Sequence, residues 1–240
     1  CIEKVGEEAK METRYHDRFE AGRVLATKLT AYAHRQDVLL LALPRGGVPV
    51  ASEVAKALHT SLDVFVVRKL GVPGREELAM GALASGGIEV LNEEVVDTWH
   101  IPEQVINTVA EQELQEIHRR EQLYRDDRPR LAVGGRTVVL IDDGLATGAT
   151  MRAAVKAVRQ QHPARLIVAV PVAAPSACEA FQTEVDEVIC VKTPEPFYGV
   201  GYWYEHFSQT TDQEVHDLLA QAEHNRLFIS VRDPATWETR

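Results

Sequence analysis

Apolar runs with the length of β-strands alternate with helical patterns along most of this chain. They fall at 38–43, 62–67, 137–141, 166–170 and 188–191, and the run at 38–43 is continuously apolar, as expected of a strand buried on both faces. Segments with helical spacing of apolar residues separate them, and helices are predicted at 17–33, 48–58, 103–125, 148–160, 176–181 and 212–222. This alternation predicts an α/β fold with a mostly parallel twisted sheet and helices on both faces.

Two stretches depart from the alternation. Residues 68–77 contain Gly71, Pro73 and Gly74, which predict a long irregular loop, and short strands are expected after it at 78–84 and 88–91. Residues 194–207 are rich in aromatic side chains and are predicted to form a second loop.

The segment 138–150 carries the strongest signal for chemistry. Its apolar strand ends in Asp142 and Asp143, and Thr147, Gly148 and Thr150 open the next helix. Ligands of open α/β sheets bind beyond the carboxyl ends of the strands, and a helix N-terminus favours a phosphate. The carboxylates can accept hydrogen bonds from a sugar diol, while a metal ion relieves their repulsion. A plain turn and a helix cap are the alternatives, but the combination favours a phosphosugar site.

Three further segments fit such a ligand. Arg45-Gly46-Gly47 follows the first strand and would place a cation and a free backbone near a second anion, with a plain glycine turn as the alternative. Arg68 and Lys69 open the 68–77 loop, which could close over a leaving group, with a solvated basic turn as the alternative. The aromatic rings of 198–204 suit a planar base.

These residues resemble the type I phosphoribosyltransferases, which use 5-phosphoribosyl 1-pyrophosphate (PRPP). The resemblance implies that Asp142 and Asp143 bind the ribose hydroxyls and Mg2+. It implies a 5-phosphate site made of consecutive residues of the motif, which are Ala146, Thr147, Gly148, Ala149 and Thr150. The segment Arg45-Gly46-Gly47 matches the pyrophosphate loop of the family.

The remaining matches come from two purine branches of the family. The 68–74 segment is similar to the flexible loop of adenine phosphoribosyltransferases, and 198–205 to the hood of the hypoxanthine-guanine enzymes. The hood match implies that Tyr198 stacks on the base, and that Glu205 lies near the metal. Lys192 would match the lysine that reads a 6-oxo group, although the intervening stretch is far shorter here. Trp203 is a further candidate for base binding, with a hydrophobic plug under the loop as the alternative.

One position departs from the hypoxanthine-type pattern. Those enzymes carry an acid immediately before Thr-Gly, where this chain has Ala146. Adenine-type enzymes also have alanine there and take a glutamate from the flexible loop, a role that Glu77 would fill, with Glu76 as the alternative. The overall resemblance is to predicted bacterial phosphoribosyltransferases of unsettled substrate.

Composition narrows the class of protein. The 240 residues are 45% hydrophobic and carry a net charge of −10, which argues against a nucleic-acid surface. The apolar runs are too short to span a bilayer, and no leader pattern precedes them, so no membrane partner is expected. The three cysteines, Cys1, Cys178 and Cys190, are predicted to be reduced, as two core thiols and one terminal residue of a cytoplasmic protein.

The expected organisation is one domain with short additions. Residues 1–10 are interpreted as an extension or an expression remnant, 11–225 as the phosphoribosyltransferase-like domain, and 226–240 as a C-terminal tail. The hood is expected at about 192–209, and the resemblance implies a homodimer.

The predicted function is transfer of a 5-phosphoribosyl group from PRPP to a nitrogenous, purine-like base, with release of pyrophosphate and with Mg2+ as cofactor. Two alternatives remain open. One is a regulatory protein that senses a nucleotide or PRPP without turnover, and the other is a nucleotide phosphorylase or hydrolase that uses the same pocket.

Overall fold

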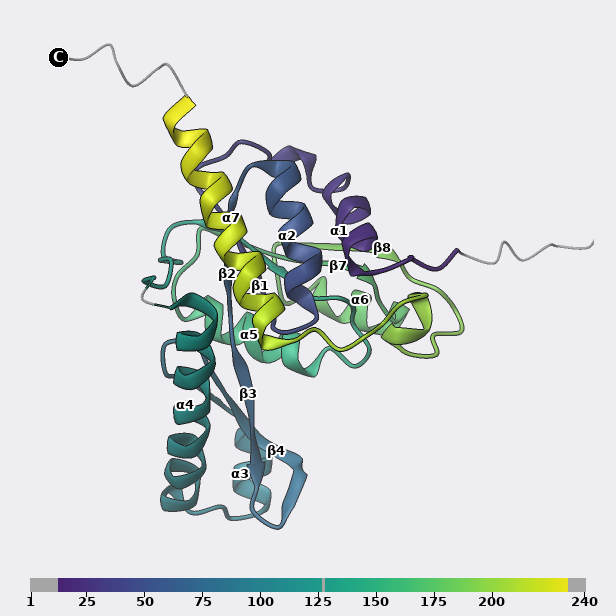
Figure 1. Ribbon diagram of the computed structural model, residues 1–240. Helices are drawn as coiled ribbons and strands as arrows, with labels where there is room; N and C mark the ends of the chain where they lie inside the picture. The colour runs from purple at the N-terminus through teal and green to yellow at the C-terminus, as the bar shows by residue number, and fades with distance from the viewer. Residues whose placement is uncertain (1–12, 127, 233–240) are drawn as a thin grey trace, which may run out of the picture.

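A five-stranded parallel sheet forms the centre of the molecule in the computed structural model, which describes residues 13–126 and 128–232 (Figure 1). Its strand order is β2-β1-β6-β7-β8, and all four pairings are parallel. The strands are β1 (Val38–Ala42), β2 (Ser61–Val64), β6 (Thr137–Ile141), β7 (Arg165–Val172) and β8 (Glu187–Lys192). The predicted fold class, a mostly parallel sheet with helices, is therefore confirmed.

Successive residues of the strands face two different hydrophobic cores. In β1, Leu40 and Ala42 belong to the core that includes residues of α1 (Arg18–Ala26), α2 (Gly47–Leu58) and α7 (Asp212–Arg232). Leu39 and Leu41 belong to the opposite core, with residues of α5 (Ala149–Arg159) and α6 (Pro175–Phe181). Because both faces are covered, the central strands β1 and β6 are buried at every position, whereas the edge strand β8 is only half-buried.

A separate antiparallel sheet projects beyond one end of the main sheet. It has the order β3-β4-β5, made of β3 (Val67–Val72), β4 (Arg75–Ala84) and β5 (Ile88–Leu91). Together with α3 (Glu93–Thr98) and the long α4 (Glu103–Arg125), it forms what we call the hairpin lobe, seen in the lower part of Figure 1.

The hairpin lobe corrects the prediction of an irregular loop at 68–77. Most of this segment belongs to β3 and β4, which pair from Val67 opposite Ala84 to Val72 opposite Arg75. The Pro73-Gly74 pair forms the turn between the strands, and Gly74 adopts a φ of +76°. Proline and glycine occur both in long loops and in tight hairpin turns, so the sequence did not distinguish the two. The pairing of β3 with β4 makes this segment a hairpin.

Other boundaries also differ from the predictions. The first helix ends at Ala26 and is followed by a short 3₁₀ helix, η1 (Thr30–Tyr32), so the predicted helix 17–33 was too long. The predicted strand 62–67 ends at Val64, and α3 was not anticipated. The last helix, α7, continues beyond the predicted residue 222 to Arg232. The predicted extension at 1–10 lies outside the described residues.

A disulfide joins Cys178 of α6 to Cys190 of β8, so the prediction of two reduced core thiols was wrong. The two Cα atoms are 6.5 Å apart, and both side chains are half-buried where α6 packs against the edge of the sheet. Twelve residues separate the cysteines in sequence, and only the return of the chain from α6 into β8 brings them together. Cys1 lies outside the described residues.

Over the part of the chain that the structure describes, no helix combines the length and the apolar character needed to cross a lipid bilayer.

Candidate active site

The two glycine-containing segments meet where β1 and β6 end. These strands are neighbours, with Ala42 opposite Ile141, so the turn after β1 and the acid pair after β6 emerge side by side. The fit is close, because a Cβ atom on Gly46 would lie 2.1 Å from Oδ2 of Asp143. A Cβ atom on Gly47 would lie 2.7 Å from the carbonyl oxygen of Ile141. Any larger residue at these two positions would push the turn away from the acids.

Asp143 is held by a guanidinium group that the sequence did not reveal. Nε of Arg18, on α1, donates to Oδ2 of Asp143 at 2.8 Å, and the two side chains are only 11% and 15% exposed. Arg18 also donates to the carbonyl oxygen of Ser208 at 2.7 Å and stacks over the ring of Phe207, 3.9 Å from its centroid. The hydroxyl of Tyr204 donates to the carbonyl oxygen of Asp143 at 2.6 Å. The acid is therefore connected both to α1 and to the segment that follows β8.

The acid pair resists ionisation. Burial raises the pKa of Asp142 well above its ordinary value, and the adjacent carboxylate of Asp143 raises it further. Burial also raises the pKa of Asp143, although the guanidinium of Arg18 opposes this rise. Such a pair is stabilised by any ligand that brings positive charge or hydrogen-bond donors.

The predicted phosphate loop forms the turn between β6 and α5. Leu145 anchors it to the end of β7, since its N–H donates to the carbonyl oxygen of Val172 at 2.9 Å. Gly148 caps α5 in the left-handed region, with φ of +72°, and a Cβ atom there would lie 2.7 Å from Cε2 of Phe181. Ala146, Thr147, Ala149 and Thr150 are exposed. The loop thus presents accessible hydroxyls and the amide end of an eleven-residue helix to an anion.

Arg45 lies beside the N-terminus of α7. Its guanidinium NH1 is 3.8 Å from Oδ1 of Asp212, and both side chains are about one-third exposed. The hydroxyl of Tyr124, on α4, donates to the same carboxylate oxygen at 2.7 Å. These contacts link the predicted pyrophosphate turn to the hairpin lobe.

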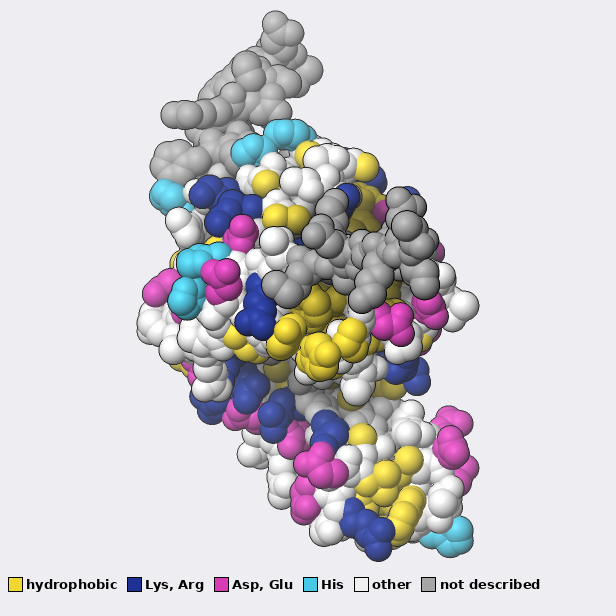
Figure 2. Space-filling model, turned by 90° about the vertical axis from the view of Figure 1, so that its right-hand side faces the viewer, with side chains coloured by type: hydrophobic (Ala, Val, Ile, Leu, Met, Phe, Trp, Pro, Cys, Tyr) yellow, Lys and Arg dark blue, Asp and Glu magenta, His cyan; other side chains and the backbone are white. Residues whose placement is uncertain are grey.

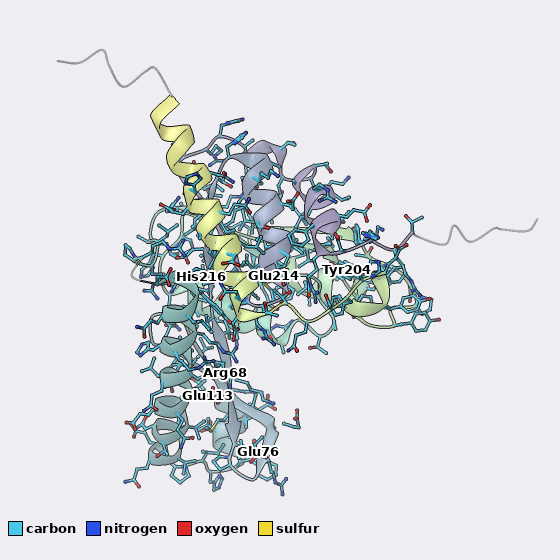
Figure 3. All side chains as sticks on the ribbon, in the orientation of Figure 1. Arg68, Glu76, Glu113, Tyr204, Glu214 and His216 are labelled. Carbon is cyan, nitrogen blue, oxygen red and sulfur yellow. A yellow bond between two sulfur atoms is a disulfide. The ribbon has the colours of Figure 1, made fainter. Side chains whose placement is uncertain are left out.

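The hairpin places its two cations on different faces. Nε of Arg68 contacts Oε2 of Glu113 at 2.6 Å, and the two side chains point toward one another between β3 and α4 (Figure 3). Lys69, on the other face of β3, is 3.5 Å from the fully exposed carboxylate of Glu77. The predicted roles of these three residues stay predictions, and the structure shows that Arg68 is engaged by α4.

The hood residues also differ in accessibility. Tyr198 and Tyr202 are 67% and 45% exposed, and their ring centroids are 5.0 Å apart. Trp203, at 8% exposed in the short helix η2 (Val200–Trp203), packs in a small core with Tyr15 and other residues. Lys192 lies 3.9 Å from the centroid of the Tyr15 ring and donates to the carbonyl oxygen of Thr13. Of these four hood residues, Tyr198 is the most exposed, whereas the guanidinium of Arg14 lies over the Tyr202 ring, 4.1 Å from its centroid.

The acid pair fits a metal ion carried by a substrate better than an ion held by the protein alone. Among the described residues, no group of three or more acidic, histidine or cysteine side chains could hold a metal. Glu205 lies 3.1 Å from Nδ1 of His16 and is more than half exposed, and its role as a metal ligand stays a prediction. Mg2+ commonly keeps several waters and uses one or two carboxylates together with substrate phosphates, which Asp142 and Asp143 can supply.

Sequence reasoning missed Arg18 and the hydroxyl of Tyr204. Arg18 lies in the first helical pattern, where a basic residue normally faces solvent, and nothing in its neighbourhood marks it as a contact of a residue 125 positions away. Tyr204 was considered only as part of an aromatic loop. Neither position had a local signal that could have identified it.

The chain belongs to the phosphoribosyl transferase domain family, whose family model matches residues 12–204. Proteins of two Mycobacterium tuberculosis strains, provisionally named phosphoribosyl transferases, are 44% identical over 208 residues. That alignment covers 87% of this chain and 47% of theirs, so the chain spans about half the length of these curated relatives. The solved structure of TT1426 from Thermus thermophilus is 41% identical, with a TM-score of 0.76, and the match covers 87% of this chain and 99% of that one.

Proposed function

We propose that the protein transfers a 5-phosphoribosyl group from PRPP to a nitrogen atom of a purine-like base and releases pyrophosphate. The observation that carries the proposal is the acid pair itself. Asp142 and Asp143 are adjacent carboxyl groups with raised pKa values. The turn at Gly46 and Gly47 packs against them on one side, and the exposed loop of residues 146–150 lies on the other. This arrangement can bind the diol of a sugar that carries an anionic group on either side of it.

The binding roles follow from the positions of the groups. The α5 N-terminus with Thr147 and Thr150 would bind the 5-phosphate, and Asp142 and Asp143 would accept hydrogen bonds from the ribose hydroxyls. The turn at Arg45 would bind the pyrophosphate. Mg2+, held by the two carboxylates and the oxygen atoms of PRPP, would offset charge on the leaving group.

Transfer then depends mainly on positioning and electrostatics. Departure of pyrophosphate leaves positive charge at the anomeric carbon. The carboxyl groups of Asp142 and Asp143 would stabilise that charge once bound Mg2+ has favoured their ionised forms. Glu77 would act as the base that accepts a proton from the incoming nitrogen, and Lys69 would act beside it. Both lie on the projecting hairpin, so a movement of the hairpin toward the main sheet would bring them to the substrate and exclude water.

The hood would provide the surface for the base. Tyr198 and Tyr202 present exposed rings, and an aromatic face suits any planar heterocycle, so their geometry supports a base without naming it. We propose further that the protein acts as a homodimer in the cytoplasm.

A pyrophosphate-release assay separates transfer from the other two functions. The protein is mixed with PRPP, Mg2+ and a panel of purine and pyrimidine bases, and release is followed with and without each base. Release that requires a base supports transfer, release without a base supports hydrolysis, and saturable PRPP binding without release supports sensing.

A single substitution tests the placement of the site. Asp143→Asn should abolish base-dependent release while circular dichroism shows an unchanged fold. Asp97→Asn, an exposed acid in α3, is the matched control and should keep full activity. Activity of Asp143→Asn equal to that of the control would remove Asp143 from the site.

A further inference from the structure

A cavity lies between the hairpin lobe and the flank of α5. Its volume is about 350 Å3, within the range of roughly 300–1,000 Å3 that is typical of small-molecule sites. Neither the acid pair, the glycine turn nor the hood contributes to its lining, which consists of described residues of β3, β4, β5 and α5 and of Asn92. The cavity is distinct from the acid pair but adjoins the candidate active site, because Lys69, Ala149 and Thr150 belong to both.

The lining has a charge unlike that of the whole chain. It contains Lys69, Arg152 and Lys156 and no acidic residue, in a protein whose net charge is −10. Figure 2 shows Lys and Arg side chains gathering where the lower lobe meets the main body. A cavity of this kind attracts a small anion.

The ion pairs that these cations already form determine how much negative charge a ligand would need to supply. Arg152 is paired with Glu184 at 2.8 Å, and Lys69 lies 3.5 Å from Glu77. Lys156 is exposed, and none of the ion pairs formed by the described residues includes it. One uncompensated cation, one helical turn from Arg152 on the same side of α5, fits a single phosphate group.

The opposite wall is mainly apolar. It is formed by the antiparallel sheet, whose lining residues other than Lys69 are Val67, Ala79, Gly81, Ala82, Val90 and Leu91. At its edge, Asn92 carries an amide that can donate to and accept from the rim of a heterocycle. A planar ring would lie against this sheet face while its phosphate reaches α5.

We propose that this cavity is a regulatory site for a nucleoside monophosphate. Its phosphate binds Lys156 and Arg152, and its base lies on the sheet face beside Asn92. Because the ligand would contact both β3 and the first turns of α5, it would fix the hairpin relative to the phosphate loop. Binding there is independent of PRPP chemistry, so the proposal stands or fails separately from the proposed function.

The test is isothermal titration of the full chain with AMP, GMP, CMP and UMP, without PRPP. The variants are Lys156→Glu, Asp143→Asn and the matched control Lys28→Glu, which reverses an exposed lysine elsewhere. We expect one binding event whose affinity is reduced about tenfold or more by Lys156→Glu and changed less than about twofold by the other two substitutions, because a charged hydrogen bond is lost there only at residue 156. A nucleoside monophosphate is also the product of the proposed transfer, so a second event that is weakened by Asp143→Asn and not by Lys156→Glu is assigned to the active site.

Comparison of ligands tests the apolar wall. Ribose 5-phosphate and inorganic phosphate lack the ring and should bind at least about tenfold more weakly than the best nucleotide, since they cannot use the sheet face. Equal affinity for inorganic phosphate would overturn the assignment to nucleotides. The proposal is also overturned if no nucleotide binds, or if every binding event keeps its affinity in Lys156→Glu, which would place the nucleotide in the active site alone.

Discussion

The contact between Arg18 and Asp143 gives the sharpest prediction for stability. Replacing Arg18 with methionine keeps an apolar stem of similar length but removes the charge that faces a carboxylate exposed to only 15%. It also removes the hydrogen bond to the carbonyl oxygen of Ser208 and the stacking on Phe207. We expect the variant to fold and to be clearly less stable than the wild-type protein.

The magnitude follows from the burial of the pair. Removing one partner of a buried ion pair costs about 3–5 kcal/mol, because the remaining charge is left uncompensated. Both side chains keep some solvent exposure, so we expect a loss of about 3 kcal/mol in the free energy of unfolding, or a fall in Tm of roughly 6–12 °C for a chain of this size. Adding Asp143→Asn should restore most of this loss, since no charge then remains without a partner.

The effect should also depend on pH. Burial already raises the pKa of Asp143, and Arg18 opposes that rise, so the pKa rises further in Arg18→Met. The carboxyl then binds a proton more tightly in the folded than in the unfolded state, and the unfolding free energy of the variant increases as pH falls through the folded pKa. The difference between variant and wild type should therefore be smaller at pH 5 than at pH 8.

Urea unfolding followed by circular dichroism measures these differences in the wild type, the two single variants and the double variant. Arg23→Met is the control, because it breaks a looser ion pair, 3.4 Å from Glu53, in which the arginine is 57% exposed. It should cost less than about 1 kcal/mol. A coupling energy between Arg18 and Asp143 below about 0.5 kcal/mol would refute the reasoning.

Three further predictions concern the same region of the fold. Asp142→Asn should raise the unfolding free energy at neutral pH, because ionisation of the buried Asp142 is unfavourable in the folded state. In urea unfolding, this gain should vanish below the ordinary aspartate pKa of 3.8. Equal stability of variant and wild type at pH 8 would contradict the prediction. Thiol titration of the denatured, unreduced protein should find Cys178 and Cys190 unreactive, and reduction should lower the unfolding free energy by about 2–4 kcal/mol; two additional reactive thiols before reduction would show that the bond is absent. Gly148→Ala should cost about 1–2 kcal/mol or more and weaken PRPP binding in calorimetry, because φ is +72° and an aromatic ring lies 2.7 Å from the new Cβ atom. Gly134→Ala, where a Cβ atom makes only an ordinary contact at 3.5 Å, is its control, and equal losses in the two variants would argue against the strain.

The regular parts of the fold could be predicted because their signals are local. Strand-length apolar runs located the strands of the main sheet, most clearly β1 and β6, where burial on both faces requires apolar residues at successive positions. The hairpin at 67–84 could not be predicted in the same way. Gly71, Pro73 and Gly74 are compatible with a loop and with a tight turn, and the choice depended on cross-strand pairing and on packing against α4.

For the candidate site, the sequence determined which functional groups lie at the edge of the sheet. Two adjacent acids after a buried strand and a Thr-Gly helix start must emerge together at one edge of a parallel sheet, because the order of residues and the direction of the strands leave no other arrangement. The turn at Gly46 was predicted at the same edge for the same reason, and it lies there.

Only the tertiary structure decided which side chains meet these groups. Arg18 reaches Asp143 across 125 residues, Arg68 is engaged by Glu113, and Cys178 is joined to Cys190. Each contact depends on how helices and loops pack around the sheet, and packing geometry is set by many weak contacts distributed over the whole chain. The sequence therefore specified the groups at the edge of the sheet, whereas their partners and the cavity beside α5 arose from the packing of distant elements.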